Sequence, residues 1–389
     1  MLPWLSWNRN FRLLAIAVFG SGIFFGVQFA LFHNFIVERI GIEAHELGYM
    51  EALREVPGFL NALFIAVTIL LSPPLLGGVS LIVMGLGLAL YSQADSFSAV
   101  LIYSFVWSIG FHAWLPLEGA MSLFYSEGEE KGKWLGSLRS VQSLSMLAAI
   151  VLCKFAVDVL EFGGLFQIGG AAVAVGGIAL MFASRQLQTE REPRFVLKKR
   201  YWLYYLLSFL QGCRRQIFIT FAVFALVKVY GTDRSVIITL ILINQLVVFA
   251  CSPLMGWLVD KLGERIMLTA SYIGLTFIFV GYALLKNPHH LYVLYCLDNF
   301  LFVGGIAMTT YLNKIAPKSD LKPTLAMGVT MNHIAAVGAP LVGGLIWMKL
   351  GYEIIFLSGG AIAFITLIVT QWMKTESLLA GAEPEAAAD

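Results

Sequence analysis

The sequence predicts an all-α polytopic membrane protein with twelve transmembrane helices, arranged as two six-helix bundles. Of its 389 residues, 59% are hydrophobic and 13% are charged, and the mean hydropathy is +0.80. Soluble proteins carry roughly 25% charged residues, so we expect most of this surface to face lipid. At about 20 residues for each crossing, the length accommodates about twelve helices. A long polar segment near the middle of the chain divides them into two sets.

Apolar runs and the polar turns between them define the individual elements. The predicted spans are 11–35, 46–71, 74–93, 97–124, 135–157, 163–183, 202–229, 235–258, 266–286, 290–313, 324–348 and 353–373. They predict an N-terminal six-helix bundle over 1–184, a linker over 185–201, a C-terminal bundle over 202–374, and a disordered acidic, alanine-rich tail over 375–389.

The basic residues indicate the orientation in the membrane. They are concentrated in alternate loops, for example in the linker at Lys198, Lys199 and Arg200. The positive-inside rule therefore predicts that the linker and both termini are cytoplasmic. We expect a multi-pass protein of the bacterial inner membrane, monomeric and surrounded by the lipid bilayer. The net charge of +2 gives no indication of a nucleic-acid partner.

Motifs of enzymes and of metal sites are missing from the sequence. The four cysteines lie in separate apolar runs, so neither a disulfide framework nor zinc spacing is predicted. There is no Walker loop, dinucleotide fingerprint, nucleophile elbow or HExxH sequence. We therefore expect no enzyme activity, no catalytic residues, no metal and no cofactor. An ion gradient or the gradient of a small-molecule substrate must then supply the energy.

A charged turn between two apolar runs carries the most specific motif. Gly256–Ile266 reads GWLVDKLGERI. It resembles the signature loop of the major facilitator superfamily, G-x-L-x-D-[RK]-x-G-x-[RK], and Gly263 suits the sharp reversal of the chain there. The resemblance implies two six-helix bundles that rock around a central cavity. It also implies that Asp260 and Arg265 form a charge latch in one transport state.

The matching turn of the first half departs from that signature. Residues 72–77, SPPLLG, correspond to residues 252–256, SPLMG, but no charged residues follow them. The resemblance therefore implies that cytoplasmic gating depends mainly on the C-terminal half.

The first half carries two groups of polar residues within predicted spans. Glu51, Arg54 and Glu55 share one face of the second helix, because they are three and four residues apart. They form either a self-neutralising structural cluster or an outer gate with a carboxylate that can take a proton.

The fourth predicted helix carries the second group, His112, Trp114 and Glu118. Glu118 lies at the depth of Arg139, so we expect these two to pair, in a role that can be wholly structural. Trp114 is a candidate substrate contact. A lone histidine in a membrane is more often a hydrogen-bonding group between helices than a proton carrier, which is how we interpret His112.

The second half has the denser polarity near the middle of the membrane. Arg214 and Arg215 are adjacent in the seventh predicted helix, and Asp298 is the one carboxylate at similar depth in that half. Asp298 can neutralise one arginine. The other needs a lipid headgroup, a carboxylate of the first half or an anionic ligand. The predicted substrate-binding residues are Arg214, Arg215, Gln211, Asn244, Gln245, Asn332, His333 and Trp114.

Together with the resemblance, these observations predict a secondary transporter, and the resemblance implies that it works by alternating access. We expect a small organic solute, anionic or amphipathic, coupled to H⁺. The candidate proton carriers are Asp298, Glu51, Glu55 and Glu118, and the residues for charge pairing or gating are Arg54, Arg139, Asp260 and Arg265. Two alternatives stay open. One is an exporter of hydrophobic drugs or lipids, in which the charges are structural. The other is a non-transporting factor that assembles or delivers another membrane component.

Overall fold

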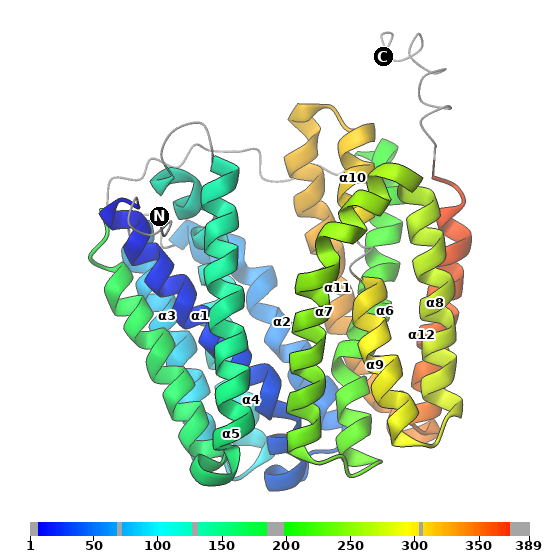
Figure 1. The fold of residues 1–389 in the computed structure, drawn as a ribbon, viewed down its shortest axis with the longest axis horizontal. Helices are drawn as coiled ribbons and strands as arrows, with labels where there is room; N and C mark the ends of the chain where they lie inside the picture. The colour runs from blue at the N-terminus through cyan, green and yellow to red at the C-terminus, as the bar shows by residue number, and fades with distance from the viewer. Residues whose placement is uncertain (1–6, 68–71, 127–130, 185–197, 303–305, 374–389) are drawn as a thin grey trace. The chain divides into compact units, whose positions relative to one another are not determined.

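The computed structural model describes residues 7–67, 72–126, 131–184, 198–302 and 306–373. Within these ranges the chain is helical and contains no strand (Figure 1). The elements are α1 (Arg9–Phe35), η2 (Ile36–Ile40), α2 (Ala44–Val67), α3 (Pro73–Leu90), η3 (Tyr91–Gln93), α4 (Phe97–Tyr125), α5 (Lys131–Leu180), η4 (Lys199–Tyr201), α6 (Trp202–Lys228), α7 (Arg234–Leu262), α8 (Glu264–Leu284), α9 (Pro288–Phe302), α10 (Ile306–Ile315), α11 (Lys318–Leu350) and α12 (Tyr352–Thr370). The all-α, multi-pass architecture is thereby confirmed.

Eight helices in the described part of the chain are long and apolar enough to cross a membrane. This number does not test the predicted twelve, because α5 alone covers two predicted spans. Its 50 residues are interrupted at Glu161, where φ is 51° and ψ is −175°. In addition, α9 and α10 lie on either side of residues 303–305, which are outside the described ranges. The number of crossings and the location of the termini stay predictions.

The chain forms two compact units. The first contains residues 1–191 together with 223–242, and the second contains residues 192–222 together with 243–389. The first unit therefore includes the tip of the α6–α7 hairpin as well as α1–α5. The six-plus-six division into bundles at the linker stays a prediction.

Small residues allow the helices of the first unit to approach closely. A Cβ atom on Gly20 of α1 would lie 2.9 Å from the carbonyl oxygen of Ala172 in α5, and one on Gly26 would lie 2.6 Å from the Cβ of Ala149. Any side chain at these positions would push the two helices apart. Membrane helices gain most of their packing energy from such close contact, since lipid provides little hydrophobic driving force.

The second unit has a core rich in tyrosine. Tyr201, Tyr204, Tyr272 and Tyr311 are buried in it together with leucine and methionine side chains. At one edge of this unit the chain reverses between α7 and α8. Gly263 forms the reversal with a φ of 82°, which confirms the role expected for this glycine.

Candidate functional site

The most buried charges of the second unit belong to one ion pair. Arg214 in the middle of α6 donates to Asp298 of α9 across 2.8 Å, and the two side chains are 1% and 7% exposed. A pair buried this deeply is costly to desolvate, and losing either partner would leave the other charge uncompensated. This arrangement suits a structural role for both groups.

The space beside Arg214 supports that interpretation. The cavity there has a volume of about 10 Å³ and is lined by Gln211, Ser271 and Tyr272 among others. That volume is about the size of one water molecule, so no organic solute fits against this face of the arginine. The Tyr272 hydroxyl donates to Gln211 Oε1 across 3.5 Å and closes the site further.

Arg215 differs from its neighbour in its environment. It is the central residue of α6 and is exposed, whereas Arg214 is buried. Successive residues of an α-helix point about 100° apart, so one arginine turns into the unit and the other turns out of it. An arginine exposed to hydrocarbon at the middle of a membrane would cost at least about 2.5–3.5 kcal/mol. At the middle of a membrane this exposure is tolerated only where the guanidinium meets water or an anionic group.

Asn332 on α11 lies next to the same stretch of α6. Its Oδ1 would be 2.8 Å from a Cβ atom on Gly212, and its Nδ2 donates to the carbonyl of Gly328 across 3.1 Å. Asn244 on α7 is buried and hydrogen-bonded to the side chain of Tyr295. Gln245 and His333 are each partly buried. The structure thus brings Asn332 and Gln211 to the level of the arginines, and gives Asn244 a partner within the unit.

Four charged or titratable side chains meet in the first unit, between α2 and α4. Glu51 and Arg54 form an ion pair, and the Arg54 guanidinium lies 4.5 Å from the centre of the Trp107 ring. His112 Nε2 lies 3.8 Å from Glu55 Oε2. The shared helix face expected for the α2 residues is present. The sequence did not reveal that His112 belongs to this cluster.

Neutral hydrogen bonds hold the cluster in place. His112 Nδ1 lies 3.0 Å from both the hydroxyl and the carbonyl of Ser108, and the Ser108 hydroxyl donates to the carbonyl of Arg54. Trp107 Nε1 donates to the Tyr91 hydroxyl across 2.8 Å. These bonds connect η3, α4 and α2, so the imidazole is fixed in position beside Glu55.

The fourth helix brings Glu118 and Arg139 together as their depth in the sequence predicted. Glu118 Oε1 lies 3.6 Å from Arg139 NH1, which also donates to Gln142 across 2.8 Å. Trp114, a candidate substrate contact, is 1% exposed and lies one turn before Glu118. Its ring is covered in this structure.

Of the two residues predicted to form the charge latch, the structure describes the side chain of Arg265 only. The side chain of Asp260 lies outside the described part of the structure. Arg265 donates to Gln371 Oε1 across 3.3 Å and 3.4 Å. At the same edge of the second unit, Lys314 Nζ lies 3.2 Å from Glu264 Oε1, a pair that the sequence did not indicate.

A second unpredicted contact joins the end of the linker to α11. Asp320 accepts hydrogen bonds from Lys198 across 2.8 Å and from Tyr201 across 2.7 Å. The hydrogen bond from Lys198, followed by that from Tyr201, lowers the pKa of the Asp320 carboxyl below its usual value.

Polar contacts also hold the tip of the α6–α7 hairpin inside the first unit. Lys154 of α5 donates to the carbonyl of Ser235 and to the Thr239 hydroxyl, each across 2.7 Å. Arg234 pairs with Asp158 across 2.8 Å. Sequence reasoning missed Lys154 because its partners in this contact are neutral oxygens, which have no signature in the charge pattern.

The model of the Major Facilitator Superfamily matches residues 14–309 and 204–387. No curated protein sequence matches the chain.

Several solved structures share the fold. The nucleoside transporter NupG is 13% identical, with a TM-score of 0.79, over 95% of this chain and 100% of that one. A bacterial homologue of the human lysosomal transporter Spinster, inward-facing and unoccupied, is 12% identical, with a TM-score of 0.72, over 96% and 98%. A peptide transporter, POT, in complex with sulfate is 14% identical, with a TM-score of 0.71, over 94% of each chain. Identities this low establish a common fold and leave the solute open.

Proposed function

The chain belongs to the Major Facilitator Superfamily, and from that premise we propose that it is a secondary transporter of a small organic solute with an anionic group. It moves the solute by alternating access and is driven by H⁺. The protein is a multi-pass integral membrane protein. We place it in the bacterial inner membrane as a monomer.

The exposed guanidinium of Arg215 supports the choice of an anionic solute. Its neighbour Arg214 already has a buried carboxylate, Asp298, at 2.8 Å. Arg215 adds a second positive charge at the centre of α6, on an exposed face of the helix. In a low-dielectric surrounding such a charge attracts an anion more strongly than it would in bulk solution. A carboxylate or phosphate of the solute can accept two parallel hydrogen bonds from it.

Neutral side chains nearby suit the rest of a small solute. Gln211 lies one turn before Arg215 on α6, and Asn332 reaches the same stretch of helix from α11. Amide groups both donate and accept hydrogen bonds, so they can bind hydroxyl, amine or carbonyl groups. We assign Arg215 the anionic group of the solute, and Gln211 and Asn332 its uncharged polar groups.

Proton coupling is assigned to Glu55 and His112. Three of the four candidate carboxylates, Asp298, Glu118 and Glu51, lie beside arginines, which keep their charge at all physiological pH values. Glu55 instead faces the imidazole of His112, with Nε2 3.8 Å from Glu55 Oε2, and histidine is a residue type that commonly serves as a proton shuttle. Arg54 and Glu51 on α2 are the other charged groups of this cluster. Glu55 can therefore bind a proton while the Glu51–Arg54 ion pair stays intact.

Flux measurements on reconstituted protein test the proposal. A thermal-shift screen of detergent-purified protein first identifies a binder, because a ligand of the folded state stabilises it by mass action. Uptake of that compound into liposomes is then compared between the wild-type protein, Arg215→Ala and Arg215→Lys. The proposal expects a large loss of uptake in the alanine variant and partial uptake in the lysine variant. An analogue of the compound that lacks its anionic group should bind the wild-type protein more weakly. Full activity of Arg215→Ala with an anionic compound would contradict it.

A further inference from the structure

One lysine in a predicted membrane span of the first unit has neutral partners. Lys154 on α5 donates to the carbonyl oxygen of Ser235 and to the hydroxyl of Thr239, each across 2.7 Å, and also to the hydroxyl of Ser235. Charged side chains inside a membrane commonly pair with an opposite charge or with backbone carbonyls. The three oxygens that Lys154 contacts carry no net charge, so this contact leaves its positive charge unbalanced.

The two α7 residues that accept these hydrogen bonds do not depend on the lysine. The Thr239 hydroxyl itself donates to the carbonyl oxygen of Ser235 across 2.7 Å. A hydroxyl that bonds to the carbonyl one turn earlier is a common arrangement within a helix. These two groups would therefore stay bonded to each other if Lys154 moved away from α7.

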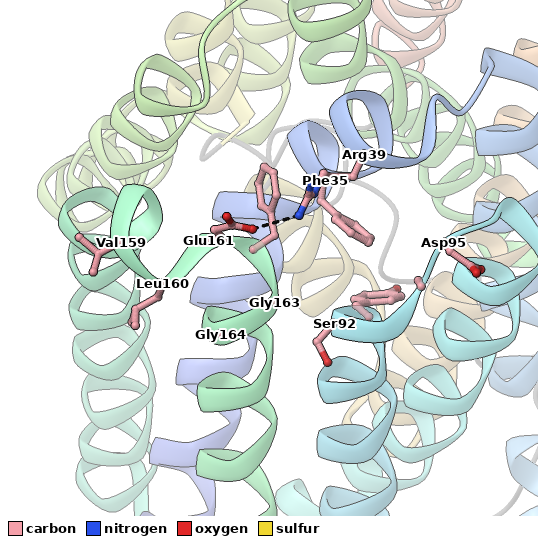
Figure 2. Close-up of a pocket in the computed structure, with 12 residues that line it drawn as sticks. Phe35, Arg39, Ser92, Asp95, Val159, Leu160, Glu161, Gly163 and Gly164 are labelled. Atoms are coloured by element: carbon pink, nitrogen blue, oxygen red, sulfur yellow. Dashed lines mark hydrogen bonds and ion pairs between the residues drawn. The ribbon is translucent and has the colours of Figure 1, made fainter.

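A carboxylate lies one turn from Lys154 on the same helix. Asp158 is four residues further along α5, and side chains four residues apart are neighbours on the surface of a helix. Asp158 is paired with Arg234, at the start of α7, across 2.8 Å. Glu161, the other carboxylate of α5, is instead turned toward Arg39 of η2 at 3.0 Å (Figure 2). Asp158 is thus the carboxylate of α5 that Lys154 and Arg234 can share.

The helices that carry the α7 partners belong partly to each unit. The tip of the α6–α7 hairpin, residues 223–242, belongs to the first unit, and the rest of both helices belongs to the second. Sharp bends in helices occur mainly at proline or glycine, and neither residue type is present at 222–223 or at 242–243. If the two units change their arrangement during transport, we therefore expect the tip to separate from α5 and to stay straight within its own helices.

We propose that Lys154 changes partners during transport, an inference that rests on the alternating-access function proposed above. While the tip contacts α5, Lys154 binds the α7 oxygens and Asp158 binds Arg234. When the tip separates, Arg234 leaves with α7, and Asp158 pairs with Lys154 on its own helix. Lys154 and Asp158 then have a polar partner in both states, and the separated state is stabilised by the new pair.

The environment of Arg234 suits such an exchange. Its side chain is 30% exposed and that of Asp158 is 76% exposed, and ion pairs this accessible to solvent contribute little to stability. Arg234 is the first residue of α7, which the predicted topology places at the outer face of the membrane. Water can therefore surround its guanidinium once the tip has separated. The exchange assigns Lys154 a role in gating.

The rate at which a buried thiol becomes accessible measures how often the tip separates. Ile238 on α7 is fully buried and lies three residues after Ser235, on the helix face that Lys154 contacts. Ile238→Cys is made in full-length protein whose four native cysteines are replaced by alanine. In nanodiscs, a charged maleimide should react with this thiol only while the tip is away from α5. Mass spectrometry follows the reaction.

Arg234→Gln and Asp158→Asn remove the same ion pair, but the proposal expects them to differ. Arg234→Gln leaves Asp158 available to Lys154, so labelling should become about two- to fivefold faster. Asp158→Asn removes a partner from both states, so the labelling rate should change less than about twofold. Lys154→Met makes the exchange impossible. In that background, both substitutions should accelerate labelling by the same two- to fivefold factor.

Two results would overturn the proposal. Equal acceleration by Arg234→Gln and Asp158→Asn with Lys154 present would mean that Asp158 serves the observed contact alone. A rate that is unchanged in every variant would mean that these charges do not govern separation of the tip.

A control thiol separates release of the tip from unfolding. Leu312, on α10, is fully buried in the second unit, so Leu312→Cys should stay unlabelled in every variant. If it were labelled at the same accelerated rate, the acceleration would come from unfolding and the proposal would be wrong. The labelling assay needs no solute, so its outcome is independent of the uptake test on Arg215. A transporter of a different solute would keep the labelling pattern, and a protein without the pattern can still transport an anion.

Discussion

The charged cluster of the first unit and the arginine centre of the second unit both hold charged side chains within membrane-spanning helices. They do so in different arrangements. In the first unit, Glu51, Arg54, Glu55 and His112 share a half-buried network that includes a group able to change its charge. In the second unit, Arg214 and Asp298 form a buried pair, and the neighbouring Arg215 is exposed. One arrangement places a carboxylate, Glu55, beside an imidazole. The other places a fixed positive charge, Arg215, on an exposed face of α6.

This difference separates two tasks that a coupled transporter must perform. A fixed cation such as Arg215 can bind an anionic group at any physiological pH, because arginine does not titrate there. A carboxylate beside a histidine can exchange protons near neutral pH. We therefore expect solute affinity to depend on the second unit and coupling to depend on the first. Variants in each region can test that division.

The largest effect should follow from removing one partner of the buried Arg214–Asp298 ion pair. Arg214→Ala leaves Asp298 as an unpaired buried charge, which typically costs about 3–5 kcal/mol. We expect a large loss of folded, monodisperse protein, measured by fluorescence-detected size exclusion and thermal unfolding. The double variant Arg214→Met with Asp298→Leu removes both charges and should recover most of the stability. A stable single variant would show that the pair is not desolvated.

Arg215→Ala should act on transport and leave the fold intact. The side chain is exposed, so its removal should change the unfolding temperature little. A hydrogen bond to a charged group contributes about 1.5–3 kcal/mol, so uptake of an anionic solute at low concentration should fall about 10- to 100-fold. Binding assays on the same preparation separate this effect from misfolding. An equal loss for an uncharged analogue would point to a structural role for Arg215.

The sequence was most informative where hydropathy and helical depth decide the outcome. Apolar runs predicted the helices, and Gly263 marked the reversal between α7 and α8. Depth along a helix also predicted the pair Glu118–Arg139 and the pairing of Asp298 with one of the two adjacent arginines, because each residue advances about 1.5 Å. These relations depend only on position along the chain.

Other features depend on rotation and tertiary packing, which the sequence does not contain. The sequence shows that Arg214 and Arg215 point about 100° apart, but not which of them faces inward. It also gives no sign that Glu161 takes a positive φ, because glycine is the residue expected there. The contact of Lys154 with Ser235 and Thr239 is equally invisible, since hydroxyl and carbonyl oxygens occur on every helix.

A smaller effect should appear when Glu55, the proposed proton-binding group of the first unit, is replaced by a residue that cannot ionise. Glu55→Gln cannot ionise, so uptake should lose its response to an imposed pH gradient while exchange at equal pH continues. Counterflow and gradient-driven uptake in liposomes measure the two activities. The matched control is Glu118→Gln, which removes a carboxylate that forms an ion pair with Arg139 and should retain the response. Gradient-driven uptake by Glu55→Gln at the wild-type rate would place coupling elsewhere.

The smallest effect is expected at the ion pair between Lys198 and Asp320, at the edge of the second unit. This pair is partly exposed, whereas the Arg214–Asp298 pair is buried. Hydrogen bonds from Lys198 and Tyr201 lower the pKa of Asp320, so its ionised form stabilises the folded state. That contribution is complete above the carboxyl's unfolded pKa of about 3.9 and is lost as the pH falls through the lower, folded value. Asp320→Asn should therefore lower the unfolding temperature by a constant amount at pH 6–8, and the gap should close in acid. A gap that persisted at the lowest pH would mean that packing, and not the charge of Asp320, links the linker to α11.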